Sequence, residues 1–141
     1  MDKKRYIGAF LALFVFTFLY DWFVHGFLMM SMYEETSQVW RDYGSDMASC
    51  LSLSIPYQLI LSAWTAFAFT KIYKEGGLTN GLYFGLYFGV FAGILTGAWY
   101  IWLPVPAKLG ASWFVSSVIY GLGGGAVLGS TYRTKPSRFF R

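Results

Sequence analysis

Four long apolar segments follow one another along the chain, and short polar stretches separate them. They cover residues 6–32, 51–70, 80–103 and 112–132. Each segment provides roughly the 20 apolar residues that a helix needs to cross the hydrocarbon core of a bilayer. The first is longer than one span requires, so we expect it to tilt or to project beyond the membrane. The pattern predicts an all-α membrane protein in which residues 1–141 form a single domain of four transmembrane helices.

Glycines recur at every fourth residue of the third apolar segment. In a helix this spacing puts them on one face, where the absence of side chains lets a neighbouring backbone approach closely within a bilayer. The fourth segment carries a second stripe, so we expect the last two helices to pack through their glycine faces, with Gly85 opposite Gly129. The stripes comprise Gly81, Gly85, Gly89, Gly93 and Gly97 in the third segment, and Gly121, Gly125 and Gly129 in the fourth.

The basic residues indicate how the helices are oriented. All but two of the 11 Lys and Arg lie before the first segment, between the second and third, or after the fourth, and the exceptions are Arg41 and Lys108. The positive-inside rule then predicts that both termini are cytoplasmic and that the chain is a multi-pass protein of the bacterial inner membrane. The net charge of +4 fits contact with lipid head groups. It does not predict nucleic-acid binding, because no exposed module combines basic and aromatic residues.

Two ionisable residues inside the first segment are candidates for function. Asp21 and His25 are four residues apart, so in a regular helix they share a face, and their position along the segment places both in the outer half of the membrane. Such residues need partners, since burying them alone is costly. Polar residues at a similar depth, together with one from the outer loop, could complete a polar pocket: Ser54, Gln58, Ser116, Tyr120 and Arg41. The stripe on the second segment continues with Ser62 and Thr65. The alternative is that these residues only fix helix pairing through hydrogen bonds.

A carboxylate one turn from an imidazole suits several kinds of chemistry. It can orient the ring for proton transfer, base catalysis or metal ligation. A metal site needs three or four ligands, for which His25, Glu34 and Glu35 are weak candidates, so no metal site is predicted. His25 alone could ligate a haem or chlorophyll, but a lone histidine in a span is more often structural, and no cofactor is predicted. Because no nucleophile motif occurs, we assign no catalytic residue and favour a protein that is not an enzyme.

The end of the first segment and the loop after it carry a series of distinctive residues. An acidic residue and a His-Gly pair precede a Tyr-x-x-Thr and a Trp-Arg pair, and the last helix starts with Trp-Phe. This series resembles the pattern of an uncharacterised family of small four-span proteins of the bacterial inner membrane. The resemblance implies the fold but no activity. The residues that carry it are Asp21, His25, Gly26, Tyr33, Thr36, Trp40, Arg41, Trp113 and Phe114.

Two functions fit these observations. Aromatic residues make up 22% of the chain, and rings such as Tyr83 and Tyr87 flank the glycine stripe, which suits docking against another protein. We therefore expect a structural or accessory subunit of a larger inner-membrane complex. Its partners would be the lipid bilayer and other membrane-protein subunits or a second copy, and not nucleic acid. The alternative is a polar-pocket protein that binds or conducts a proton, a metal, a quinone or a lipid head group through Asp21 and His25.

Overall fold

The computed structural model describes residues 2–40 and 47–133, and none of these residues forms a strand. Four helices are long and apolar enough to cross a membrane: Lys3–Leu28, Cys50–Ile72, Leu78–Ile101 and Ala107–Thr131. This is the architecture of an all-helical, multi-pass membrane protein.

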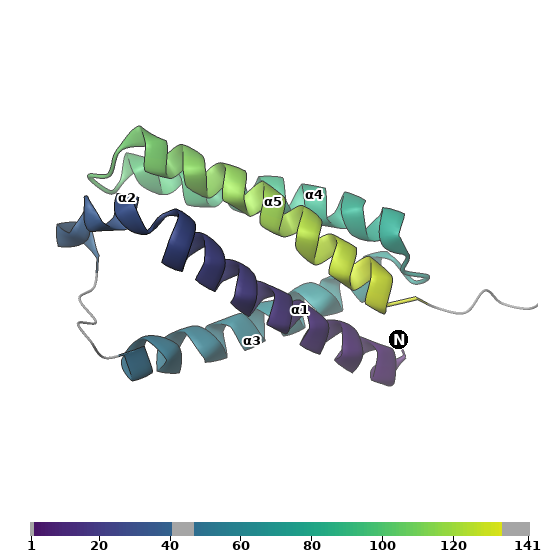
Figure 1. The fold of residues 1–141 in the computed structure, drawn as a ribbon. Coiled ribbons are helices and arrows are strands. Elements are labelled where there is room, and N and C mark those ends of the chain that lie inside the picture. The colour runs from purple at the N-terminus through teal and green to yellow at the C-terminus, as the bar shows by residue number, and fades with distance from the viewer. Residues whose placement is uncertain (1, 41–46, 134–141) are drawn as a thin grey trace, which may run out of the picture.

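The helices are numbered along the chain as in Figure 1. The chain begins with α1 (Lys3–Phe23), a π-helical turn η1 (Val24–Leu28), the short helix α2 (Met30–Glu34) and the 3-10 turn η2 (Ser37–Val39). It continues with α3 (Met47–Ile72), α4 (Leu78–Gly97), the 3-10 turn η3 (Ala98–Ile101) and α5 (Ala107–Thr131). The N-terminus, the α3–α4 turn and the end of α5 lie at one end of the bundle, and α2 lies at the opposite end, called here the α2 end.

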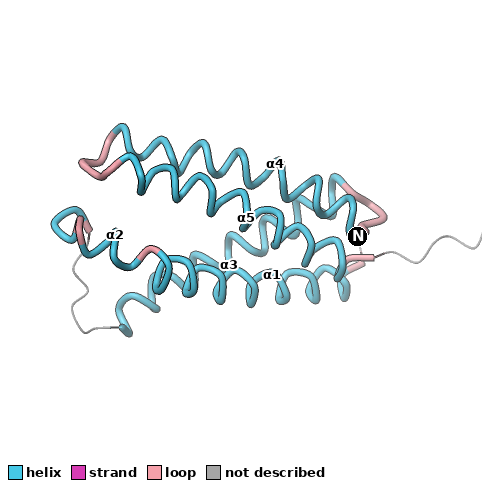
Figure 2. The backbone as a smooth tube through the Cα atoms, turned by 45° about the horizontal axis from the view of Figure 1, so that its top comes forward, coloured by secondary structure: helices cyan, strands magenta, loops and turns pink. Residues whose placement is uncertain are grey.

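The helices α4 and α5 lie side by side along their whole length (Figure 2). A Cβ atom on Gly85 would lie 2.0 Å from the carbonyl oxygen of Gly121, and one on Gly81 would lie 2.1 Å from that of Gly125. No side chain fits at such distances, so the two backbones can approach this closely only at glycine. Gly89 is likewise buried against α5.

The register of this pair differs from the one expected by counting along the sequence. Gly85 lies against Gly121 and Gly125, and not against Gly129. The counting placed the start of the third span at residue 80, whereas α4 already begins at Leu78. The earlier start moves every glycine of α4 further from the end of the bundle at which α5 terminates.

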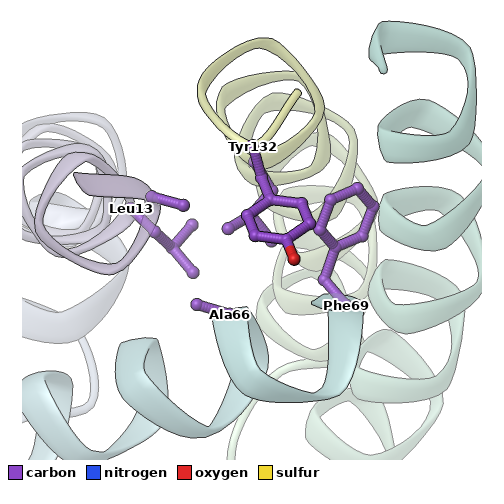
Figure 3. Packing of buried hydrophobic residues seen from close by; sticks show 6 residues of the cluster. Leu13, Ala66, Phe69 and Tyr132 are labelled. Carbon is purple, nitrogen blue, oxygen red and sulfur yellow. The ribbon is translucent and has the colours of Figure 1, made fainter. Parts of the chain in front are cut away.

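A small hydrophobic core joins α1, α3 and α5 toward the end of the bundle where α5 ends, and Figure 3 shows its packing. Leu13 of α1, Ala66 and Phe69 of α3, and Tyr132 just after α5 are at most 2% exposed. The ring of Phe69 also meets Phe84 of α4 edge-to-face, with centroids 5.3 Å apart. These contacts close the bundle at this end.

The first apolar segment is not one continuous α-helix over residues 6–32. The α-helical part ends at Phe23, the π-helical turn follows, and α2 starts at Met30 after a bend. Gly26 lies in the π-helical turn, and its weak helix propensity permits the irregular backbone. A π-helical turn adds a residue to one turn, so it rotates the residues after it relative to those before it. Asp21 lies in the last regular turn of α1, whereas His25 lies within the π-helical turn itself.

Candidate functional site

Asp21 is held by a residue of the neighbouring helix α3. The side-chain amide of Gln58 donates a hydrogen bond from Nε2 to Oδ2 of Asp21 at 3.0 Å. The other amide atom, Oε1 of Gln58, is buried and finds no hydrogen-bond donor among the described residues. A buried amide oxygen lowers stability unless a donor reaches it. The contact thus places one carboxylate and one unpaired acceptor between α1 and α3.

His25 bonds to the α2 segment. Its Nδ1 atom lies 2.7 Å from the hydroxyl of Tyr33 in α2. The same hydroxyl accepts a hydrogen bond from Nε1 of Trp113 in α5 at 2.8 Å. Burial raises the pKa of Tyr33, although the hydrogen bond from Trp113 opposes the rise. The three side chains form a continuous chain of hydrogen bonds from the first membrane helix to the last.

The donors in this series of hydrogen bonds determine which nitrogen of His25 carries the hydrogen. An indole can only donate, so the oxygen of Tyr33 accepts from Trp113 and keeps its own hydrogen to give away. The sulfur of Met29, 3.9 Å from that oxygen, is a weak acceptor, whereas Nδ1 of His25 is a strong one at 2.7 Å. We therefore assign Nδ1 as the acceptor. A neutral imidazole then carries its hydrogen on Nε2, which can donate to another group.

His25 forms part of the wall of a pocket of about 230 Å³ at the α2 end of the bundle. Indole rings provide much of this wall, and Trp40 packs edge-to-face on Trp113 with the ring centroids 5.9 Å apart. An aromatic wall with a few polar groups is typical of sites for small organic ligands. The wall comprises His25, Trp40, Thr96, Trp99, Leu103, Trp113, Ser116 and Ser117. We call this space the His25 pocket.

The two candidate residues on α5 bond to α1. The hydroxyl of Tyr120 lies 2.9 Å from Oγ1 of Thr17. The hydroxyl of Tyr20 donates to the backbone carbonyl of Ser116 at 2.7 Å and lies 3.1 Å from its Oγ. These bonds fix α1 against α5, and Ser116 also reaches the His25 pocket.

The remaining candidates lie outside these contacts. Ser54 is half-buried on α3, one turn before Gln58, and Arg41 lies outside the described residues. Glu34 and Glu35 are exposed at the end of α2. Within residues 2–40 and 47–133, no group of three His, Cys, Asp or Glu side chains could hold a metal ion.

Sequence reasoning did not single out the residues that hold His25. Tyr33 connects His25 to Trp113. Trp99 lines the pocket together with His25 and Trp113. Tyr33 and Trp113 do belong to the series on which the family resemblance depends, and that series was the one available signal. It gave no indication of which residues touch, because the contact depends on the break after α1.

Comparison with protein families, curated proteins and solved structures finds no match for the chain. The resemblance to a four-span family therefore stays a prediction. What the protein does has to follow from its own pocket and hydrogen bonds.

Proposed function

We propose that the protein binds a membrane-borne ligand in the His25 pocket, and that the ligand has a hydrogen-bond-accepting head, either a quinone ring or a lipid head group. The observation that carries this proposal is the hydrogen-bond chain from Trp113 through Tyr33 to His25. It leaves Nε2–H of His25 as a donor for a carbonyl, ester or phosphate oxygen. The indole rings of Trp40 and Trp99 would cover the head from the sides.

The size of the pocket supports a ligand that inserts only its head. Pockets that enclose a whole drug-sized molecule measure about 300–1,000 Å³, and the His25 pocket is slightly smaller at about 230 Å³. A quinone or a lipid can leave its tail in the surrounding bilayer. Neither a bare proton nor a metal ion requires a wide aromatic wall. These two ligands therefore fit the His25 pocket less well than a quinone or a lipid head group does.

Asp21 would support this site from the preceding helical turn. Its bond to Gln58 ties α1 to α3 just before the π-helical turn that carries His25. We infer that this bond fixes the end of α1 from which His25 projects.

Titration of the purified parent protein with a short-tailed benzoquinone and with a short-chain phospholipid, followed by tryptophan fluorescence, tests the proposal. We expect one of the two to bind saturably. His25→Ala should weaken that binding about tenfold or more, since it removes one hydrogen bond. Gln38→Ala, an exposed position in η2, is the matched control and should bind like the parent. Equal binding by His25→Ala and the parent, or no saturable binding of either probe, would contradict the proposal.

We infer further that the protein lies in the inner membrane of a bacterium with both termini in the cytoplasm. Basic residues support this orientation, because Arg5 and Arg133 meet at the end of the bundle that holds the N-terminus, where Arg5 donates to the carbonyl of Arg133. Lys71 and Lys74 lie in or beside the α3–α4 turn at the same end. The His25 pocket would then lie on the outer side of the membrane.

A second function, that of an accessory subunit, is favoured by the shape of the α4–α5 pair. We propose that the glycine stripes hold the pair together as a glycine zipper in the membrane. The opposite face of α4 carries exposed rings, including Tyr83, Tyr87 and Phe91. These rings would dock against another membrane protein or a second copy.

Purification from native membranes followed by mass spectrometry separates the two functions. Stoichiometric recovery of another membrane protein, lost in Tyr87→Ala but kept in His25→Ala, would support the accessory role. Recovery of the chain alone with a bound quinone or lipid, lost in His25→Ala, would support the ligand-binding role.

A further inference from the structure

A row of buried polar atoms on α3 is not explained by the His25 pocket. Oε1 of Gln58, Oγ of Ser62 and Oγ1 of Thr65 are buried, and no described residue forms a hydrogen bond with any of them. The three residues are 7%, 0% and 4% exposed. Their spacing of four and then three positions puts them on one face of the helix, where they continue inward from Asp21.

Several threonine hydroxyls among the described residues donate to a carbonyl of their own helix. Thr96 donates to the carbonyl of Ala92 at 3.0 Å, and Thr131 donates to that of Val127 at 2.7 Å. Threonine and serine commonly bond in this way in membrane helices, because no other partner is then needed. Ser62 and Thr65 form no such bond, so their buried hydroxyls need another partner.

The space beside Thr65 fits a very small molecule. A cavity of about 10 Å³ lies between α1, α3, α4 and α5, and the hydroxyl-bearing residues in its wall are Thr65 and Tyr120. Tyr120 is itself bonded to Thr17 at 2.9 Å. This volume is close to the smallest that holds one water molecule. Water is small enough and can both donate and accept, which satisfies hydroxyls and an amide oxygen alike.

We propose that this face of α3 binds ordered water, with one molecule in the cavity beside Thr65 and further molecules at the unpaired atoms of Gln58 and Ser62. The water extends the polar contact between Asp21 and Gln58 toward the middle of the bundle. The row of unpaired atoms ends at Thr65, one turn before Phe69 of the hydrophobic core, whose packing Figure 3 shows. This site lies away from the His25 pocket and does not depend on the ligand proposed there.

Solid-state NMR of the full chain in lipid bilayers tests the proposal through magnetisation transfer from water to individual residues. We expect transfer to Ser62 and Thr65. We expect none to Ile60 and Trp64, which lie on the exposed, lipid-facing side of the same helix at 71% and 66% exposure. Absence of transfer to both Ser62 and Thr65 overturns the proposal.

A substitution at Thr65 provides a second readout. Thr65→Val removes the hydroxyl with little change in volume, so it should reduce transfer to Ser62 and lower the thermal midpoint of unfolding. Thr131→Val is the matched control, because that hydroxyl is already bonded within its own helix. If Thr65→Val does not fold, Thr65→Ser keeps the hydroxyl and should show the transfer of the parent. A higher midpoint in Thr65→Val than in the parent would show that the face is dry and would overturn the proposal.

Discussion

At the scale of single residues, Tyr33 determines what His25 can do. It is bonded both to His25 and to Trp113, so it links the irregular end of the first helix to α5. The proposed role requires a neutral Tyr33 that donates its hydrogen. Burial, which raises the pKa of this hydroxyl, keeps it in that form.

Replacing Tyr33 by phenylalanine should therefore destabilise the protein. Tyr33→Phe leaves the indole N–H of Trp113 without its acceptor, and we expect a loss of about 1–3 kcal/mol in the free energy of unfolding. Tyr83→Phe is the matched control, since Tyr83 lies on the exposed face of α4. Denaturation in detergent measures both variants, and equal stability of Tyr33→Phe and the parent would contradict the assigned hydrogen bonds.

Comparing Tyr33→Phe with the parent also predicts how the free energy of unfolding changes with pH. The pKa of Tyr33 is raised in the folded protein, so its contribution to stability is complete below the unfolded pKa, about 10, and is lost as the pH rises through the folded pKa. The parent should lose more stability than Tyr33→Phe above about pH 10. Parallel curves for the two proteins across this range would show that Tyr33 is not buried as described.

Residues differ in how far their contacts can be predicted from the sequence. Asp21 and Gln58 could be expected to meet, because depth along two straight helices follows from simple counting. The contact between His25 and Tyr33 could not be expected in this way. It depends on a π-helical turn and a bend, which the hydrophobic pattern of the sequence does not reveal. The unpaired state of Ser62 and Thr65 depends on side-chain orientation, which spacing alone leaves open.

At the scale of helices, the contact between α4 and α5 depends on backbone proximity. A single added methyl group on Gly85 would collide with the backbone of Gly121, which cannot move aside as a side chain can. Apolar length was enough to predict the four spans. It could not fix the register of the pair, because the start of α4 at Leu78 depends on the turn formed by the residues just before it.

Gly85→Ala should therefore separate α4 from α5. We expect a loss of about 1–3 kcal/mol, the usual effect of overpacking a tight contact. Gly8→Ala is the matched control, because nothing lies within 4 Å of the position its Cβ atom would occupy. Thermal unfolding of the two variants in the same detergent checks the result. A Gly85→Ala protein as stable as Gly8→Ala would mean that the helices lie further apart.

At the scale of the whole molecule, the two ends of the bundle differ. Apolar side chains close the end that holds the N-terminus and the end of α5, and the His25 pocket occupies the α2 end. If that pocket serves a ligand from the outer side, both termini must be cytoplasmic. A C-terminal fluorescent reporter that matures only in the cytoplasm should be bright, and a reporter that is active only outside the membrane should be silent. The reverse pattern would place the pocket on the inner side.

The most direct test of the central claim is ¹⁵N NMR of the His25 ring in lipid bilayers, with and without the quinone or phospholipid that binds. Without ligand, we predict that Nδ1 accepts from Tyr33 and that the hydrogen is on Nε2. On binding, the Nε2 signal should shift, and it should shift equally in Gln38→Ala, the variant expected to bind like the parent. A hydrogen on Nδ1, or an Nε2 signal that the ligand leaves unchanged, would contradict the claim that His25 presents a donor to the ligand.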